Sequence, residues 1–159
     1  MKLLVVAVGR ARGAVAEAVA DYEQRARRYW KLEVVEVPAG VRGSAAAPPE
    51  RVREAEGERI LARIPAGLDV VALTRLGHVM SSRELAAYLQ ELGTRSAPGA
   101  VFVIGGAFGL GEAVLERADR RLSLSPLTMP HEMARLVLAE QLYRAGTIVR
   151  GEPYHKEQG

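Results

Sequence analysis

The feature that most constrains the fold is a regular alternation between short apolar runs and longer amphipathic stretches. The runs at 2–8 (KLLVVAV) and 100–105 (AVFVIG) are apolar at almost every position. This pattern is typical of parallel strands that are buried on both faces of a sheet. Runs at 32–37 and 69–74 predict two further strands, and 120–125 predicts a weaker fifth strand.

Helical patterns fill the intervals between these runs. The best-marked helix begins with a capping box formed by Ser81 and Glu84, continues with an apolar i, i+3, i+4, i+7 face, and is expected to stop at Gly93. The other helices are expected at 14–30, 50–64, 111–118 and 131–145. Strands that alternate with helices predict an α/β fold, in which a mostly parallel sheet is flanked by helices on both faces.

Length and composition limit the classes of protein that this chain can belong to. We expect its 159 residues to form a single domain over 1–159, with a mobile loop at the low-complexity segment 39–50. The absence of cysteine excludes disulfides, a thiolate nucleophile and a cysteine metal site. The three histidines lie too far apart in sequence for a recognisable metal motif, so no metal is expected.

Charge and hydropathy point to a mildly basic, cytoplasmic protein. A formal charge of +3 permits a nucleic-acid partner without requiring one. The apolar run in the opening MKLLVVAVGR is too short for a signal peptide, and no later run is long enough to cross a bilayer. We therefore expect a cytoplasmic location and no membrane partner.

Four glycines in the segment 105–111 (GGAFGLG), here called the glycine turn, follow the fourth predicted strand. Ligands of parallel α/β sheets bind beyond the carboxyl ends of the strands, so this turn is a candidate cofactor loop. It matches neither the dinucleotide fingerprint nor a phosphate loop. A tight strand-to-helix turn without a ligand remains the alternative interpretation.

The segment 122–135 (LSLSPLTMPHEMAR) is unusually apolar for a connection that contains two prolines. A connecting segment normally runs over the surface and is polar. Pro126 and Pro130 prevent regular strand or helix pairing across most of the segment. The segment is therefore either a buried loop or the lining of a pocket.

Three further groups of residues have both a functional and a structural interpretation. The segment 22–31 (YEQRARRYWK) mixes basic and aromatic residues that could bind RNA, or it forms a solvated helix face. Glu140 and Arg144 are spaced as an i, i+4 ion pair. Tyr154, His155 and Lys156 form either a substrate clamp or a disordered end.

Several motifs together resemble one known family. They are VFVIGGAFG at 101–109, LSLSPLTMPHEMARLVLAEQLYRA at 122–145 and PYHKE at 153–157, with KLLVVAVGR at the start and VPAG at 37–40. This combination is similar to the bacterial methyltransferases that modify N3 of a pseudouridine in large-subunit ribosomal RNA, which belong to the SPOUT class. The resemblance covers essentially the entire chain. The alanine-rich loop at 44–47 and the final EQG depart from the family pattern without touching its motifs.

The resemblance implies a C-terminal trefoil knot, S-adenosylmethionine as the cofactor and a homodimer with each site near the interface. The last helix is then a candidate for part of that interface. Apolar walls and a few backbone groups suit an adenine ring. Carried over position by position, the cofactor-binding residues would be Leu73, Gly105, Leu124, Ser125, Pro126, Leu127, Thr128 and Met129.

The implied reaction is displacement of the sulfonium methyl by a nucleobase nitrogen of large-subunit ribosomal RNA within the ribosome. Such a nitrogen needs a base to remove its proton and a cation to stabilise the developing anion. We expect His155 or Glu140 to be the base, Arg144 to be the cation and Tyr154 to stack on or orient the nucleobase.

Two other functions fit parts of the sequence. A non-catalytic RNA-binding or ribosome-assembly factor with the same fold is the principal alternative. The alternation of strands and helices alone would also allow a flavodoxin-like nucleotide- or flavin-binding protein, although the chain has no phosphate loop.

Overall fold

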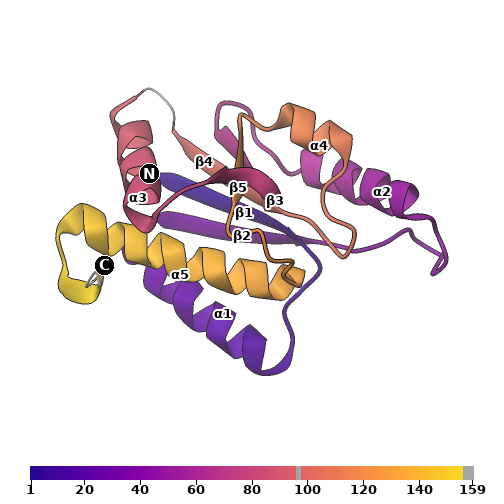
Figure 1. Cartoon of the computed structure of the whole chain (residues 1–159), viewed down its shortest axis with the longest axis horizontal. Helices are drawn as coiled ribbons and strands as arrows, with labels where there is room; N and C mark the ends of the chain where they lie inside the picture. Colours follow the sequence, from indigo (N-terminus) through magenta and orange to yellow (C-terminus); the bar gives the residue numbers. More distant parts are fainter. Residues whose placement is uncertain (96–97, 156–159) are drawn as a thin grey trace.

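A five-stranded, all-parallel sheet forms the centre of the molecule (Figure 1). The computed structural model describes residues 1–95 and 98–155, apart from the side chain of His155. The strand order is β2-β1-β4-β3-β5. The strands are β1 (Lys2–Val8), β2 (Lys31–Val37), β3 (Asp69–Val79), β4 (Gly99–Ile104) and β5 (Arg120–Ser123). The α/β fold with a parallel sheet, predicted from the alternation, is confirmed.

Helices cover both faces of the sheet (Figure 1). Helices α1 (Gly13–Ala26), α3 (Ser82–Thr94) and α5 (His131–Arg150) lie on one face, and α2 (Pro49–Leu61) and α4 (Glu112–Arg117) lie on the other. Alternate residues of each strand therefore point into two separate cores. The larger core contains Phe102, Leu138 and Leu142, and the smaller core contains Val6 and Ile60. Every residue of β4 is buried, as its continuous apolar run predicts.

Four predicted helix ends were wrong: α1 stops at Ala26 rather than at residue 30, α2 stops at Leu61 rather than at residue 64, and α3 and α5 run beyond their predicted ends. The capping box of α3 is present, but the helix runs through Gly93 to Thr94. A Cβ at Gly93 would meet no atom within 4 Å, and glycine within a helical turn costs only about 1 kcal/mol relative to alanine. Helix α5 continues five residues beyond its predicted end at Ala145 and stops at Gly151, which has a positive φ of 68°.

Helix α5 packs along α1 through aromatic side chains at the end of α1. Trp30 donates its indole N–H to the backbone carbonyl of Leu142 at 2.8 Å. A Cβ at Gly146 would lie 2.4 Å from Cγ of Tyr29, so the ring of Tyr29 fills the space that this glycine leaves. All three aromatic residues of the basic segment 22–31 are half-buried, and Tyr29 and Trp30 pack in the helix interface rather than lying on a solvated helix face.

Strand β3 is longer than predicted and irregular. Leu122 of β5 pairs with both Leu73 and His78, so the intervening residues 74–77 bulge out of the ladder. Gly77 permits this excursion, because a Cβ there would lie 2.7 Å from the backbone carbon of Arg121. An isolated glycine within an apolar strand pattern is a signal for such a bulge.

Candidate active site

A cavity of about 360 Å³ opens at the carboxyl ends of β3 and β4. Three segments line it: the bulge of β3, the glycine turn and the loop between β5 and α5. Seven of the eight residues predicted to bind a cofactor are among its lining residues, namely Leu73, Gly105, Leu124, Ser125, Leu127, Thr128 and Met129. Pro126 is exposed and is not among them. The sequence prediction thus identified residues that the fold brings together from distant positions.

The glycine turn is compact because its backbone folds closely on itself. The N–H of Gly109 donates to the carbonyl of Gly106 at 3.0 Å, and Gly109 has a positive φ of 77°. A Cβ at Gly105 would lie 2.8 Å from the backbone carbon of Gly109. A side chain at Gly105 would force the turn open, whereas glycine lets a ligand approach the backbone closely.

The loop between β5 and α5 is fixed at its start by β3. The hydroxyl of Ser123 donates to the carbonyl of Arg75 at 3.1 Å, and the hydroxyl of Ser125 accepts the N–H of Leu127 at 3.0 Å. Leu76 and Leu127 line the cavity while remaining 80% and 75% exposed. The mouth of the cavity is therefore apolar and open, and the apolar segment 122–135 is a pocket lining rather than a buried loop.

The first turn of α5 closes the cavity from the side of β1. His131 lines the cavity and lies against Gly9, where a Cβ would be 3.0 Å from Cε1 of the imidazole. One turn later, Arg135 donates to Glu23 of α1 (Nε–Oε2, 2.8 Å) and to Glu36 of β2 (Nη1–Oε2, 2.5 Å). Burial opposes the charged form of Arg135, but these hydrogen bonds outweigh it and raise its pKa. This ion-pair network anchors the helix end that borders the cavity.

The candidate catalytic residues gather near the other end of α5. The Nε of Arg144 lies 2.7 Å from Oε1 of Glu140, and its guanidinium lies 4.9 Å from the ring centre of Tyr154. The second oxygen of Glu140 accepts a hydrogen bond from Gln141 at 3.2 Å. Arg144 and Glu140 are 28% and 19% exposed, so this pair is more enclosed than an ordinary surface ion pair. The hydrogen bond from Arg144 to Glu140 raises the pKa of Arg144.

Tyr154 belongs to an aromatic cluster that covers the end of α5. Its ring centre lies 4.5 Å from that of Tyr143, which also packs against Tyr22 and Tyr29. Burial, followed by the negative charge of Glu140, raises the pKa of Tyr154 to about 12. The phenol is therefore neutral near physiological pH. The backbone of His155 ends a short 3₁₀ turn, while its side chain and Lys156 lie outside the described part of the chain.

Among the described residues, Arg144 does not reach the cavity of its own chain. Ala134 is the last residue of α5 that lines the cavity, and Arg144 follows ten positions later. An α-helix rises about 1.5 Å per residue, so the two lie about 15 Å apart along α5. One chain therefore presents a cavity at one end of α5 and a charged, aromatic cluster towards the other.

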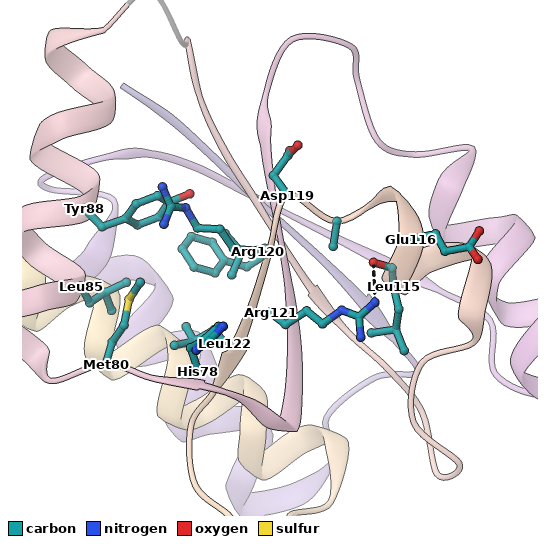
Figure 2. Close-up of a pocket in the computed structure, with 13 residues that line it drawn as sticks. His78, Met80, Leu85, Tyr88, Leu115, Glu116, Asp119, Arg120, Arg121 and Leu122 are labelled. Atoms are coloured by element: carbon teal, nitrogen blue, oxygen red, sulfur yellow. Dashed lines mark hydrogen bonds between the residues drawn. The ribbon is translucent and has the colours of Figure 1, made fainter.

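A second cavity, of about 540 Å³, surrounds the edge strand β5 (Figure 2). Its two arginines are already paired. Arg120 contacts Asp69 (Nε–Oδ2, 3.2 Å) and lies over the ring of Tyr88, while Arg121 donates to the carbonyl of Leu115 at 3.3 Å. The lining residues stand on both sides of the strand in Figure 2, so they do not converge on one ligand. The smaller cavity, which contains seven of the predicted cofactor-binding residues, is the candidate functional site.

Metal and membrane features are absent from the part of the chain that the structure describes. Over residues 1–95 and 98–155, no group of three or more His, Asp or Glu side chains is placed to hold a metal ion. Within the same ranges, no helix combines the length and the apolar character that crossing a membrane requires.

The sequence prediction missed part of the cavity. The bulge residues Thr74, Arg75 and Leu76 line it, but 69–74 was expected to be a regular strand. Gly77 was the available signal for the irregularity. Phe108 and Leu110 also line the cavity and belong to the glycine turn, although the prediction selected only Gly105 from that turn.

Comparisons with known proteins agree with this architecture. Residues 1–155 match the family model described as a predicted SPOUT methyltransferase. A ribosomal RNA large subunit methyltransferase H from Gemmatimonas aurantiaca is 54% identical, with 98% of this chain and 100% of the relative covered. The protein of the same name from Syntrophotalea carbinolica is 47% identical, with 98% and 99% covered.

Solved structures show the same fold at low sequence identity. A probable methyltransferase from Bordetella pertussis is 20% identical and superposes with a TM-score of 0.53, with 91% of this chain and 95% of that chain covered. The family match over nearly the entire length and the full-length relatives lead to one conclusion. This chain belongs to the SPOUT methyltransferase family, together with the ribosomal RNA large subunit methyltransferases H.

Proposed function

We propose that this protein transfers the methyl group of S-adenosylmethionine to N3 of a pseudouridine in large-subunit ribosomal RNA within the ribosome. One observation carries the proposal: seven of the eight residues predicted to bind the cofactor line one cavity at the carboxyl edge of the sheet. The relatives named ribosomal RNA large subunit methyltransferase H support the same substrate class.

The chemistry of the cavity fits S-adenosylmethionine. Leucine and methionine side chains supply apolar walls for the adenine ring, and the glycine turn lets backbone groups approach the cofactor closely. A Cβ at Gly105 would clash with the backbone of Gly109, so the cradle depends on the glycine. When bound, the cofactor supplies an electrophilic methyl group, and the protein supplies alignment.

In this proposal the chain from β5 to α5 passes through an earlier loop and forms the trefoil knot of the family. The segment 124–129 shares one cavity with the bulge of β3 and with the glycine turn, as a threaded segment would. Threading would also hold the apolar loop in place despite the proline residues that prevent regular pairing.

The active protein in this proposal is a homodimer that assembles each site from two chains. Arg144 lies about 15 Å along α5 from the cavity of its own chain, too far to stabilise charge on a base bound there. The mouth of the cavity exposes Leu76, Phe108 and Leu127 by 80%, 48% and 75%. Large exposed apolar patches mark interaction surfaces. A second copy would cover this mouth and bring its own charged cluster to the cofactor.

Within that composite site, Arg144 stabilises the anion that develops when the pseudouridine loses its N3 proton. Both oxygens of Glu140 are already engaged by Arg144 and Gln141, so Glu140 fits a role in orienting the guanidinium. His155 is then the proposed base. Tyr154 remains neutral and stacks on or orients the nucleobase.

Arginines around the cavity support an RNA substrate. Arg10 and Arg12 follow β1 next to the contact of Gly9 with His131, and Arg75 lines the cavity. None of the three side chains has an acidic partner among the described residues. Unpaired arginines at the edge of a site are suited to contacts with RNA phosphates.

Mass mapping of ribosomal RNA tests the proposal directly. A strain that lacks the gene is expected to lose one methyl group from one pseudouridine of large-subunit RNA. The purified protein with S-adenosylmethionine should restore that methyl on ribosomes from the strain. An unchanged map would overturn the enzymatic proposal. The non-catalytic alternative, an RNA-binding assembly factor, predicts in addition that calorimetry detects RNA binding but no heat on adding S-adenosylmethionine.

A further inference from the structure

Glu56 of α2 is a buried carboxylate that the proposed reaction does not use. Its residue is only 3% exposed. Oε2 accepts the backbone N–H of Gly40 at 2.8 Å. Oε1 is buried and has no hydrogen-bond partner among the described residues. Burying a charged oxygen without a partner is costly, and replacing buried ionic groups by apolar ones often stabilises a protein.

The unpartnered oxygen lies directly behind the glycine turn. A Cβ at Gly106 would be 2.9 Å from Oε1 and 3.0 Å from Oε2 of Glu56. Gly106 lines the cofactor cavity, whereas Glu56 does not. The carboxylate therefore contacts the face of the turn that is turned away from the ligand. Gly106 leaves room for this contact, because any side chain there would displace the carboxylate.

The same carboxylate also holds the turn that follows β2. Arg59, three residues later on α2, donates from Nη1 to the carbonyls of Pro38 and Gly40, both at 2.7 Å. Helix α2 thus binds the segment 38–40 with two side chains and contacts the glycine turn with one of them. Glu56 is the residue common to both turns, which follow separate strands of the sheet.

We propose that Glu56 is a positioning residue of the cofactor cavity, an inference that rests on the proposed use of S-adenosylmethionine. When the cofactor binds, a backbone N–H of the glycine turn donates to the free Oε1, and this bond holds the turn in its cofactor-bound form. Because Oε2 stays bonded to Gly40, cofactor binding is coupled to the segment 38–40. The cost of the unpaired oxygen in the free protein is recovered when the cofactor is bound.

Hydrogen exchange on the wild-type chain tests the coupling without any substitution. Saturating S-adenosylmethionine is expected to slow amide exchange in the glycine turn and also at Gly40, which is not in the cavity. Slower exchange confined to the cavity-lining residues would overturn the inference. If the wild-type chain shows no cofactor binding at all, the proposed function fails together with this inference.

Two substitutions then separate positioning from a general structural role. Glu56→Gln keeps one oxygen to accept the N–H of Gly40 but replaces the other, which would accept from the glycine turn, by an NH₂ group. Glu56→Met removes both oxygens. Calorimetry should show cofactor affinity lowered about tenfold in each. Thermal unfolding of the cofactor-free Glu56→Met protein should not occur at a lower temperature than that of wild type. Glu58→Gln, at an exposed position of the same helix, is the matched control.

Cofactor affinity, cofactor-free stability and amide exchange at Gly40 together distinguish the possible outcomes. Weaker cofactor binding without loss of cofactor-free stability, together with loss of the exchange effect at Gly40 in Glu56→Gln, supports the positioning role. Cofactor affinity within twofold of wild type in Glu56→Gln overturns it and leaves the proposed function intact. Parallel loss of stability and affinity in both variants also overturns it, because Glu56 would then be only a structural residue.

Discussion

The two ends of α5 carry different kinds of chemistry. At the His131 end, the cavity is lined by backbone groups of the glycine turn and by apolar side chains. Towards the Arg150 end, the cluster consists of charged and aromatic side chains that contact one another. The first end has a concave surface and few charged groups, whereas the second is rich in charged groups.

This difference separates binding from catalysis along one helix. An apolar cavity with backbone donors and acceptors can bind a cofactor but cannot remove a proton from a nucleobase. A paired arginine and carboxylate can stabilise charge but cannot enclose a ligand. The two ends are therefore expected to respond differently to substitution: one through cofactor affinity, the other through turnover.

Substitution at the charged end should have the largest effect. Arg144→Ala removes the proposed cation and leaves Glu140 without its main partner. Removal of one preorganised group that stabilises charge in the transition state typically lowers kcat about 10²- to 10³-fold. We expect a loss of this size in methyl transfer to ribosomes, with cofactor affinity within about twofold of wild type, measured by calorimetry.

A control for Arg144→Ala is Arg95→Ala, which removes an exposed i, i+4 ion pair with Glu91 on α3. Exposed pairs of this kind contribute little to stability, so activity should be unchanged. If Arg144→Ala instead weakens cofactor binding and leaves kcat unaltered, the division of roles between the two ends of α5 is wrong.

Substitution at the cavity end should reduce cofactor affinity. A Cβ at Gly105 would lie 2.8 Å and 2.9 Å from the backbone carbon and oxygen of Gly109, so Gly105→Ala must open the glycine turn. We expect cofactor affinity to fall about 10- to 100-fold, because local backbone strain costs about 1–3 kcal/mol. Gly93→Ala is the matched control, since a Cβ there meets no atom within 4 Å. Equal cofactor affinity in both variants would argue against the assigned cavity.

Mixing the two impaired variants, at a cofactor concentration too low to saturate Gly105→Ala, tests whether the two ends combine across a dimer. In a homodimer with composite sites, a mixed dimer of Gly105→Ala and Arg144→Ala chains has one site with both defects and one with neither. Random exchange of equal amounts makes half of the dimers mixed, so activity should recover to roughly a quarter of wild type. No recovery in a mixture shown by native mass spectrometry to contain mixed dimers would contradict the composite site.

Sequence analysis predicted where the cavity lies and most of the residues that line it, but not the irregular strand at its edge. Apolar runs predicted the strands because burial on both faces leaves a direct pattern, and parallel strands place their following loops at one edge. The family motifs then selected Leu124 to Met129, all of which line the cavity except Pro126. The bulge at 74–77 escaped prediction because it depends on pairing between β3 and β5, a long-range contact that only Gly77 signalled.

At the charged end of α5, sequence analysis predicted a contact within one helix but missed contacts between distant segments. The i, i+4 spacing predicted the contact between Glu140 and Arg144, because helix geometry alone determines it. The network of Arg135 with Glu23 and Glu36 joins residues from α5, α1 and β2, and no local pattern indicates it. The carboxylate of Glu56 behind the glycine turn was missed for the same reason. Contacts between distant segments depend on the assembled fold.

The smallest expected effect concerns the hydroxyl of Tyr154. Its pKa is raised to about 12 by burial and by Glu140, so the phenol stays protonated below pH 10 and cannot act as a base there. Tyr154→Phe should therefore retain activity within about threefold and leave the pH–rate profile between pH 6 and about 9 unchanged. Tyr154→Ala, which removes the ring, should lose more activity.

The raised pKa of Tyr154 also stabilises the folded protein below the unfolded-state pKa of about 10, and this contribution is lost as the pH rises to about 12. In Tyr154→Phe the alkaline loss of stability should be smaller. A shifted pH–rate profile in this variant would show that the hydroxyl takes part in proton transfer, and that the charged end of α5 contains a second titrating group.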